Sequence, residues 1–112
     1  MSVFDNKQAM VAKIVGVLEK VIEQPAKFLG DDDPASLLMW LEGFTTACTA
    51  LDIRQGYVGH DAIQKLVAIE HGWEYRSTGL VAEMQERGWR DEAIIEEVLY
   101  IEIETWKRSY GI

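Results

Sequence analysis

Apolar residues recur with helical spacing in five stretches of this chain, and no stretch alternates as a β-strand would. The five predicted helices cover residues 5–23, 34–51, 60–71, 78–87 and 91–107. The connections between them are short, and no repeat or low-complexity segment interrupts their order. The pattern predicts an all-α protein, a single compact bundle of four to five helices in one domain that spans residues 1–112.

Proline and aspartate mark the boundary between the first two predicted helices. Pro25 cannot extend the first helix, because its ring removes a backbone donor and clashes with the preceding turn. Residues 26–30 are therefore expected to form a connector. Asp33 and Pro34 start the second helix, since the carboxylate can accept from exposed amides and proline suits the first helical position.

Polar residues and glycines also bound the later helices. Ser77 or Thr78 is expected to cap the fourth helix and Asp91 the fifth, because their oxygens can accept from free backbone amides. Gly72 and Gly88 are expected to end the third and fourth helices. The sequence 52–59, with its two glycines, is typical of a loop.

Each predicted helix has one apolar face that is expected to point into the core. These faces consist of Met10, Ile14, Val17, Leu18, Val21, Ile22, Leu37, Trp40, Leu41, Phe44, Cys48, Leu51, Ile63, Leu66, Val67, Leu80, Val81, Met84, Ile94, Ile95, Val98, Leu99, Ile101 and Trp106. Leu38 and Met39 fall at the flank of the second face. They either meet a third helix or form a binding surface, and we expect the first, because most apolar residues of a small domain are in its core.

One carboxylate breaks the pattern of the last helix. At about 100° per residue, Glu102 points into the middle of an otherwise apolar face. A buried, unpaired carboxylate is costly, so it needs a partner, a proton or an opening in the core. The available partners are Arg54, Arg76, His60 and His71. We expect a buried polar site that fixes a loop to the bundle; a functional pocket and exposure at a frayed helix end are the alternatives.

The composition is that of a folded protein with one core. The chain has 112 residues, of which 48% are hydrophobic, and a single cysteine, so no intrachain disulfide can form. No apolar run approaches the roughly 20 residues of a membrane span, and the first residues lack the layout of a signal peptide. We therefore expect a cytoplasmic protein.

The net charge restricts the class of partner. Nineteen acidic residues against eleven basic ones give a net charge of -8. Phosphate groups are normally bound by clusters of Lys and Arg, so this balance argues against nucleic acid and anionic membranes as partners. A basic protein is easier to accommodate. Acidic charge that only keeps the protein soluble is the simpler interpretation.

The sequence contains no recognisable catalytic constellation. His60 and His71 lie eleven residues apart without a neighbouring carboxylate at ligand spacing, so neither a metal site nor a cofactor is predicted. Cys48 falls on the apolar face of the second helix, where a small buried thiol is expected. We expect a protein that is not an enzyme.

Two groups of acidic residues are candidate contacts for a partner. One group is formed by Asp31, Asp32 and Glu42, and the other by Glu92, Glu96, Glu97 and Glu104 on the last helix. Carboxylates that line one face can steer a positively charged protein to its site. On an exposed helix they more commonly form a solvated stripe.

Three aromatic residues in the connectors are further candidates. Trp73, Tyr75 and Trp89 lie between predicted helices. If they are exposed, they are suited to anchor an interface, because aromatic residues dominate binding hot spots. The alternative is that they close the ends of the bundle.

A family resemblance adds to this interpretation. The run Pro25-Ala26-Lys27-Phe28-Leu29-Gly30, followed by Leu37 and Trp40-Leu41-Glu42-Gly43-Phe44, resembles small bacterial proteins with an Arg-Pro-x-Met-Tyr-Leu-Gly turn and a downstream Phe-Leu-x-Gly-Tyr helix. Some members of that group are similar to immunity proteins encoded beside secreted polymorphic toxins. The matching positions are those of turns and packing, and they imply no active-site residue.

The sequence therefore supports three hypotheses. The first is an interaction module, an immunity protein that occludes a basic toxin such as a nuclease. The second is a small-ligand or regulatory bundle with a pocket near Glu102. The third is a homo-oligomer that self-associates through Leu38 and Met39.

Overall fold

The computed structural model describes residues 3–51, 53 and 57–111. Within these residues the elements are α1 (Val3–Glu23), α2 (Pro25–Leu29), α3 (Pro34–Ala50), α4 (Tyr57–Glu70), α5 (Leu80–Glu86) and α6 (Asp91–Tyr110). The described residues form six helices and no strand, which confirms the predicted all-α bundle. Five helices match the predicted ones, and the sixth is the short α2.

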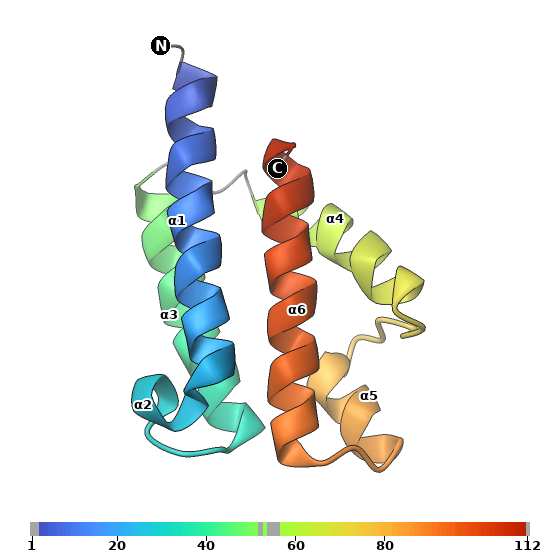
Figure 1. Ribbon diagram of the computed structural model, residues 1–112. Coiled ribbons are helices and arrows are strands. Elements are labelled where there is room, and N and C mark those ends of the chain that lie inside the picture. The colour runs from blue at the N-terminus through green and yellow to red at the C-terminus, as the bar shows by residue number, and fades with distance from the viewer. Residues whose placement is uncertain (1–2, 52, 54–56, 112) are drawn as a thin grey trace.

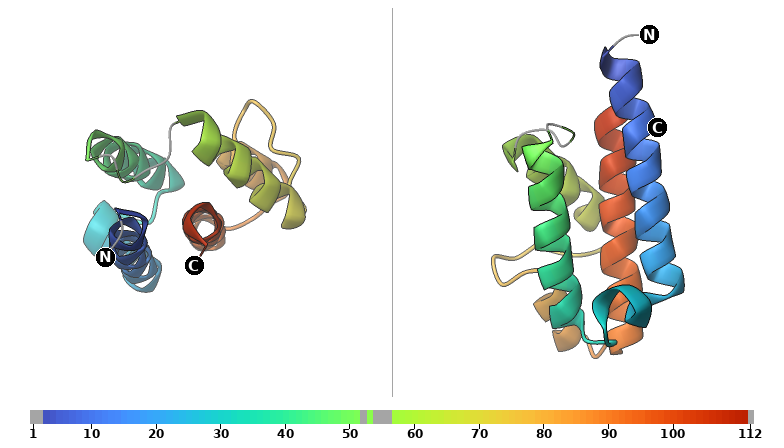
Figure 2. Two further views of the ribbon diagram at one scale, coloured as in Figure 1. Left: turned by 90° about the horizontal axis from the view of Figure 1, so that it is seen from above. Right: turned by 90° about the vertical axis from the view of Figure 1, so that its left-hand side faces the viewer.

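The last helix, α6, is the centre of the bundle. It runs antiparallel to α1 along most of its length, and α4 and α5 pack on its other side (Figure 1). Seen along the helix axes, α3 and α4 lie on different sides of α6 and diverge from each other (Figure 2). Because α6 contacts α1, α3, α4 and α5, residues around most of its circumference are buried. This is why even the polar Glu102 and Thr105 are buried.

The core confirms most of the predicted apolar faces. Its members include Ile14, Leu18, Val21, Leu37, Leu41, Cys48, Val67, Met84, Ile94, Ile95, Val98, Leu99, Ile101 and Trp106. Trp40 and Phe44 are half-buried, and their rings stack with centroids 4.9 Å apart. Cys48 is a buried thiol, as expected.

Several residues expected in the core are exposed instead. In α1 the buried stripe is formed by Val11, Ile14, Val15 and Leu18, so it is rotated away from Met10. Leu51 and Leu66 are also exposed. Leu51 follows the end of α3, and the side of α4 that carries Leu66 faces away from α6.

Leu38 and Met39 do not meet a third helix. Their side chains are 47% and 76% exposed. The prediction that they are core residues is wrong, because α4 and α5 pack on α6 and leave this side of α3 uncovered. The other possibility, a binding surface, stays a prediction.

The predicted helix boundaries are partly correct. The Asp33 carboxylate caps α3 by accepting from the amide of Ala35 at 2.9 Å. Pro25 begins α2 as well as ending α1, because proline is acceptable in a first helical turn; the predicted connector 26–30 is thus mostly helical.

The caps predicted for the last two helices are wrong. Gly79 precedes α5, so neither Ser77 nor Thr78 is its cap. Arg90 precedes α6, and Asp91 is the first residue inside that helix, where its charge still favours the positive end of the helix dipole. The predicted ends at Gly72 and Gly88 are confirmed, with φ values of 94° and 81°. Of the predicted loop 52–59, residues 57–59 belong to α4, and residues 52 and 54–56 lie outside the described residues.

None of the helices in the described part of the chain is both long and apolar enough to cross a membrane.

Candidate functional site

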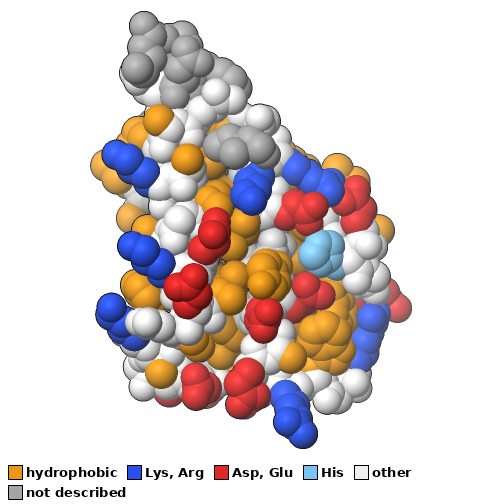
Figure 3. Space-filling view, in the orientation of Figure 1, with side chains coloured by type: hydrophobic (Ala, Val, Ile, Leu, Met, Phe, Trp, Pro, Cys, Tyr) orange, Lys and Arg blue, Asp and Glu red, His pale blue; other side chains and the backbone are white. Residues whose placement is uncertain are grey.

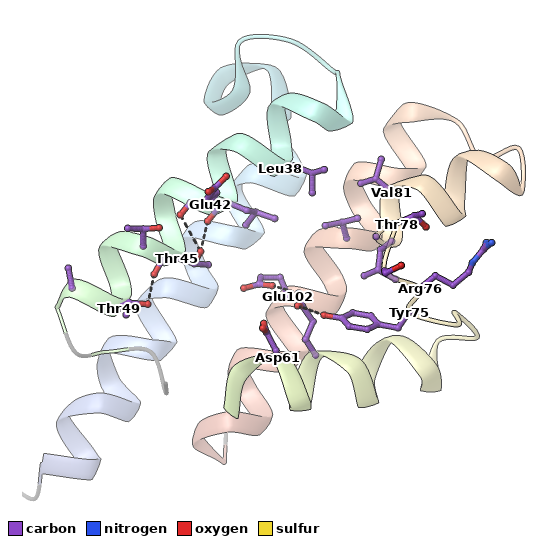
Figure 4. A pocket seen from close by; sticks show the side chains of 18 residues that line it. Leu38, Glu42, Thr45, Thr49, Asp61, Tyr75, Arg76, Thr78, Val81 and Glu102 are labelled. Carbon is purple, nitrogen blue, oxygen red and sulfur yellow. Dashed lines mark hydrogen bonds between the residues drawn. The ribbon is translucent and has the colours of Figure 1, made fainter. Parts of the chain in front are cut away.

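An open groove of about 940 Å³ lies where α3 diverges from α4 and α5. Residues of α3 form one wall (Figure 4). The opposite wall comes from α4, from the connector between α4 and α5, and from the start of α5. Val98 and Glu102 of α6 form the floor. The groove thus joins residues that are far apart in the sequence.

Glu102 holds a polar cluster together at this floor. The Glu102 residue is only 3% exposed. Its Oε1 lies 3.1 Å from Nε2 of His60, and its Oε2 accepts from the Nε2 amide of Gln64 at 2.8 Å. The Tyr75 hydroxyl in turn donates to Oε1 of Gln64 at 2.9 Å. This chain of hydrogen bonds ties α6, α4 and the connector to one another; Glu102 itself binds two residues of α4, and the connector is reached through Gln64.

His60 is one of the four candidate partners that the sequence offers for Glu102, and it lies within hydrogen-bond distance of that carboxylate. His71 and Arg76 bind other carboxylates, and Arg54 lies outside the described residues. A hydrogen bond to an ionised carboxylate requires the proton on Nε2 of His60. Nδ1 of His60 has no hydrogen-bond partner among the described residues, and the ring packs edge-on against Trp106 with centroids 5.1 Å apart. His60 is therefore held by Glu102 and by aromatic packing.

The wall formed by α3 presents hydrogen-bond acceptors. The Thr45 hydroxyl donates to the carbonyl of Leu41 at 2.8 Å, and the Thr49 hydroxyl donates to the carbonyl of Thr45 at 2.9 Å. A hydroxyl has one proton to donate, so lone pairs of both oxygens remain available as acceptors. Glu42 adds a carboxylate to the same wall (Figure 4). This wall is suited to a ligand that donates hydrogen bonds.

A buried carboxylate of α5 shapes the opposite wall. Glu83 is fully buried, and it accepts from the backbone amides of Glu74 at 2.9 Å and Arg76 at 3.0 Å. Burial acts to raise the pKa of Glu83, but these backbone donors outweigh it and lower the pKa below its ordinary value. Tyr75, between the two amides, has a φ of 61°, a conformation that few non-glycine residues adopt. The two bonds hold this turn against α5, where Tyr75 reaches Gln64.

The charge of Arg76 is directed away from the groove. Its Nη2 donates to Glu86 at 2.6 Å, and its Nε lies 3.3 Å from Glu74. Figure 4 shows the guanidinium pointing outward, past α5. Among the described residues that line the groove, Arg76 is the only Lys or Arg, whereas Glu42, Asp61 and Glu102 are acidic. The groove is therefore mostly apolar, with acidic side chains among the residues that line it.

The first predicted acidic group is only partly assembled. Asp31 and Asp32 lie in the exposed turn before α3, whereas Glu42 lies about two helical turns further along and lines the groove. The Asp31 carboxylate accepts from the amide of Asp33 at 3.0 Å and from the Ser36 hydroxyl at 3.0 Å, so it stabilises the turn. Asp32 is exposed.

The second predicted acidic group divides into two pairs. Glu92 and Glu96 are exposed on α6. Glu97 and Glu104 bind opposite nitrogens of His71, at 3.1 Å and 2.9 Å. The latter two therefore join α6 to the end of α4. On the face that shows α1 and α6, acidic side chains lie among apolar and basic ones rather than apart from them (Figure 3).

The three predicted aromatic anchors have different environments. Trp73 is buried, and its indole nitrogen donates to Glu97 at 3.2 Å, which supports the alternative of a residue that closes the bundle. Trp89 is 39% exposed and packs edge-on against Trp73, with centroids 5.1 Å apart. Tyr75 is half-buried in the groove wall.

Sequence reasoning missed several residues of the groove. Glu83 falls about 60° outside the predicted apolar face of Leu80, Val81 and Met84, so the angular test that singled out Glu102 would not have found it. Gln64 and the threonines of α3 carry no comparable signal, because uncharged polar residues are common on exposed helix faces. Their roles depend on which helices lie opposite.

The groove presents hydrogen-bond acceptors. Among the described residues, no group of three or more His, Cys, Asp and Glu side chains is arranged to hold a metal ion. The lone pairs of Thr45 and Thr49 and the carboxylates of Glu42, Asp61 and Glu102 can accept from ammonium or guanidinium groups.

Comparison with known proteins gives no relative to guide the assignment: no protein-family model, no curated protein and no solved structure matches this chain significantly.

Proposed function

We propose that this chain is a non-enzymatic interaction module that binds a basic segment of a protein partner in the groove between α3 and α4–α5. The observation that carries the proposal is the composition of the groove. Its acidic residues are Glu42, Asp61 and Glu102. Arg76 is the one Lys or Arg among the described residues that line the groove, and its guanidinium binds Glu86, which does not line it. A lysine or arginine of the partner would find acceptors there, and the apolar part would cover its aliphatic stem.

The charge of the whole molecule supports the same partner class. A net charge of -8 attracts a cationic protein over a distance of about a Debye length and speeds their encounter. Specific affinity then depends on the contacts within the groove, because rim charges mainly change the association rate. We therefore expect the association rate constant to fall steeply as salt is added.

For the biological role, we propose an immunity protein that acts in the bacterial cytoplasm. The partner would be a basic toxin, such as a nuclease, encoded beside this chain. Support comes from the acidic charge, from the groove, and from the resemblance of the segment Pro25–Phe44 to proteins of that kind. An acidic chain that covers the cationic surface of a nuclease would keep nucleic acid away from it.

Co-expression with the product of the neighbouring gene tests this role. We expect rescue from its toxicity and a complex with a Kd of about 1 µM or tighter. Absence of both rescue and complex would remove the immunity proposal.

Two matched variants test the groove itself. Thr49→Arg places a cation in the groove wall, whereas Ala47→Arg places the same charge on an exposed position of α3 that does not line the groove. We expect the first variant to weaken binding by at least about tenfold and the second to have little effect. Equal losses in both variants would show that the groove is not the binding site.

A small cationic ligand is the second candidate. The cavity beside Glu102 favours it, because about 940 Å³ is near the upper end of the range for small-molecule sites. Spermidine is a suitable probe for calorimetry. A Kd below about 100 µM for spermidine that is lost in Thr49→Arg would favour this candidate over a protein partner.

Self-association is the third candidate. Leu38 and Met39 are exposed on α3 and could be covered by a second copy. A dimer by light scattering that Met39→Ser dissociates would support it. A monomer at about 100 µM would exclude it as the main role of this face.

A further inference from the structure

The two ends of the groove differ in chemistry. Leu38, Leu41, Leu80 and Val81 gather at one end, which we call the apolar end. Thr49, Asp61, Gln64 and Glu102 gather at the other, which we call the acidic end. Figure 4 shows Leu38 and Val81 facing each other across the first, and Thr49 and Asp61 on either side of the second. Glu42 lies on the α3 wall between the two ends, at the rim.

The acidic end can accept more donors than it now holds. Within the part of the chain that the structure describes, each oxygen of Glu102 has one hydrogen bond, to His60 or to Gln64. A carboxylate offers about four acceptor positions, so a further donor can bind without displacing either residue. An ammonium or guanidinium group that reached this end would therefore find the Glu102 carboxylate and the Thr49 oxygen.

The walls of the groove favour a helical occupant. They are formed mainly by helices, whose backbone groups are already bonded within each helix, so an extended segment would find few backbone partners there. A helix satisfies its own backbone groups. The distance along α3 from Leu38 to Thr49 is about 16 Å at about 1.5 Å per residue, which equals about three turns of a partner helix.

We propose that the occupant is an amphipathic helix of about three turns with apolar residues in one half and Lys or Arg in the other. Its apolar half would lie between Leu38 and Val81, and its cationic half would reach Asp61 and Glu102. This inference rests on the proposed function and adds the class and the direction of the bound segment.

Two designed peptides test the inference. Both are hydrocarbon-stapled helices of about twelve residues with the same composition and the same groove-facing positions. The block peptide carries Leu, Leu, Lys and Lys at those positions in order, and the alternating peptide carries Leu, Lys, Leu and Lys. We expect the block peptide to bind at least about tenfold more tightly by calorimetry, because only it places each side chain in a matching environment.

A matched pair of variants checks the apolar end. Leu38→Ser removes a groove-lining side chain, and Met39→Ser removes an exposed neighbour that does not line the groove. We expect the block peptide to bind Leu38→Ser several-fold more weakly and Met39→Ser with unchanged affinity. Equal affinities for both variants would overturn the placement of the apolar half.

A nitroxide label gives the direction of the bound peptide. Attached beside its lysines, the label should broaden the amide signals of Thr49 and Gln64; attached beside its leucines, it should broaden those of Leu38 and Val81. The opposite pattern overturns the inference.

The remaining outcomes separate the inference from the proposed function. If both peptides bind equally in the groove, the inference fails and the proposed function stands. If neither binds while a basic protein partner still occupies the groove, the helical occupant is wrong. Both proposals fail if Thr49→Arg weakens neither the binding of the peptides nor the binding of any basic partner.

Discussion

Glu102 is a buried carboxylate that holds a polar cluster together and also lines the groove in which we propose that a partner binds. Its oxygens bind His60 and Gln64, so removing it would leave one buried and one half-buried polar group without this partner. The same carboxylate forms part of the groove floor. The two roles can be separated, because one depends on hydrogen bonding and the other on charge.

Substitution of Glu102 should affect stability according to the bonds that the new residue retains. We expect Glu102→Ala to lower the free energy of unfolding by about 2–4 kcal/mol, since it adds a cavity to two unsatisfied groups. Glu102→Gln should lower the free energy of unfolding by only about 1 kcal/mol, because the new side chain can bond both neighbours. Its oxygen accepts from Gln64, and its NH₂ group donates to Nε2 of His60 when that histidine carries its proton on Nδ1. Urea denaturation measures both values.

The control for this prediction is Glu96→Ala, at an exposed position of the same helix, which should change the free energy of unfolding by less than about 0.5 kcal/mol. Equal losses for Glu102→Ala and Glu102→Gln would contradict the hydrogen-bond explanation. If Glu102→Gln retains its stability but loses partner binding, the charge of Glu102 serves binding rather than folding.

At the scale of elements, the short helix α5 positions the groove wall through one side chain. Glu83 binds two backbone amides of the connector, and this places Tyr75 where its hydroxyl reaches Gln64. The connector has no regular structure of its own at these residues. Its conformation therefore depends on the carboxylate that α5 supplies.

Replacing Glu83 should loosen the connector. A glutamine has one acceptor oxygen where the carboxylate has two, so Glu83→Gln leaves one amide poorly satisfied. We expect a melting temperature lower by about 5 °C, faster hydrogen exchange at residues 74–76, and weaker partner binding. Glu86→Gln, an exposed position of the same helix that pairs with Arg76, is the control and should change the melting temperature by less than about 2 °C. Unchanged exchange rates in Glu83→Gln would show that the connector is held by other contacts.

At the scale of the whole molecule, a charged network joins the end of α4 to α6. His71 binds Glu97 and Glu104, and Arg108 binds Glu70 and Glu104. Desolvation acts to lower the pKa of His71, but the hydrogen bonds to Glu104 and Glu97 outweigh it and raise the pKa above its ordinary value of 6.5. The hydrogen bonds from His71 and Arg108 lower the pKa of Glu104, against the opposing effect of burial.

These shifts predict a pH dependence of stability. A raised histidine pKa contributes stability that is fully present below its unfolded value of 6.5 and is lost as pH rises through the folded value. The lowered pKa of Glu104 contributes stability above 4.5 that is lost as pH falls. The network should therefore stabilise the fold most near pH 5 to 6, between these values.

The variant His71→Gln isolates the contribution of the histidine. We expect the melting temperature of the wild type to exceed that of the variant by a few degrees at pH 5.5 and by less at pH 8.5, since these groups are partly exposed and their ion pairs are weak. A difference that grew with pH would contradict the direction of the pKa shift.

The fold class was accessible from the sequence for a physical reason. Helix periodicity and caps are local properties, so the five longer helices and the Asp33 cap could be predicted from neighbouring residues. Glu102 could be singled out in the same way, because a carboxylate within an apolar face must be compensated whatever the fold. His60 is one of the four partners that the sequence offers.

The groove and its lining depended on tertiary structure. Whether Leu38 is core or surface depends on where α4 and α5 pack, and that is decided by α6 at the centre of the bundle. The same reason explains why the sequence did not show that Glu97, Glu104 and Trp73 are bonded within the molecule. Glu97 and Glu104 bind His71, and Trp73 binds Glu97. The sequence by itself determined the helices and the carboxylate that needed a partner; only packing between distant segments decided which polar residues are bonded internally and which face the groove.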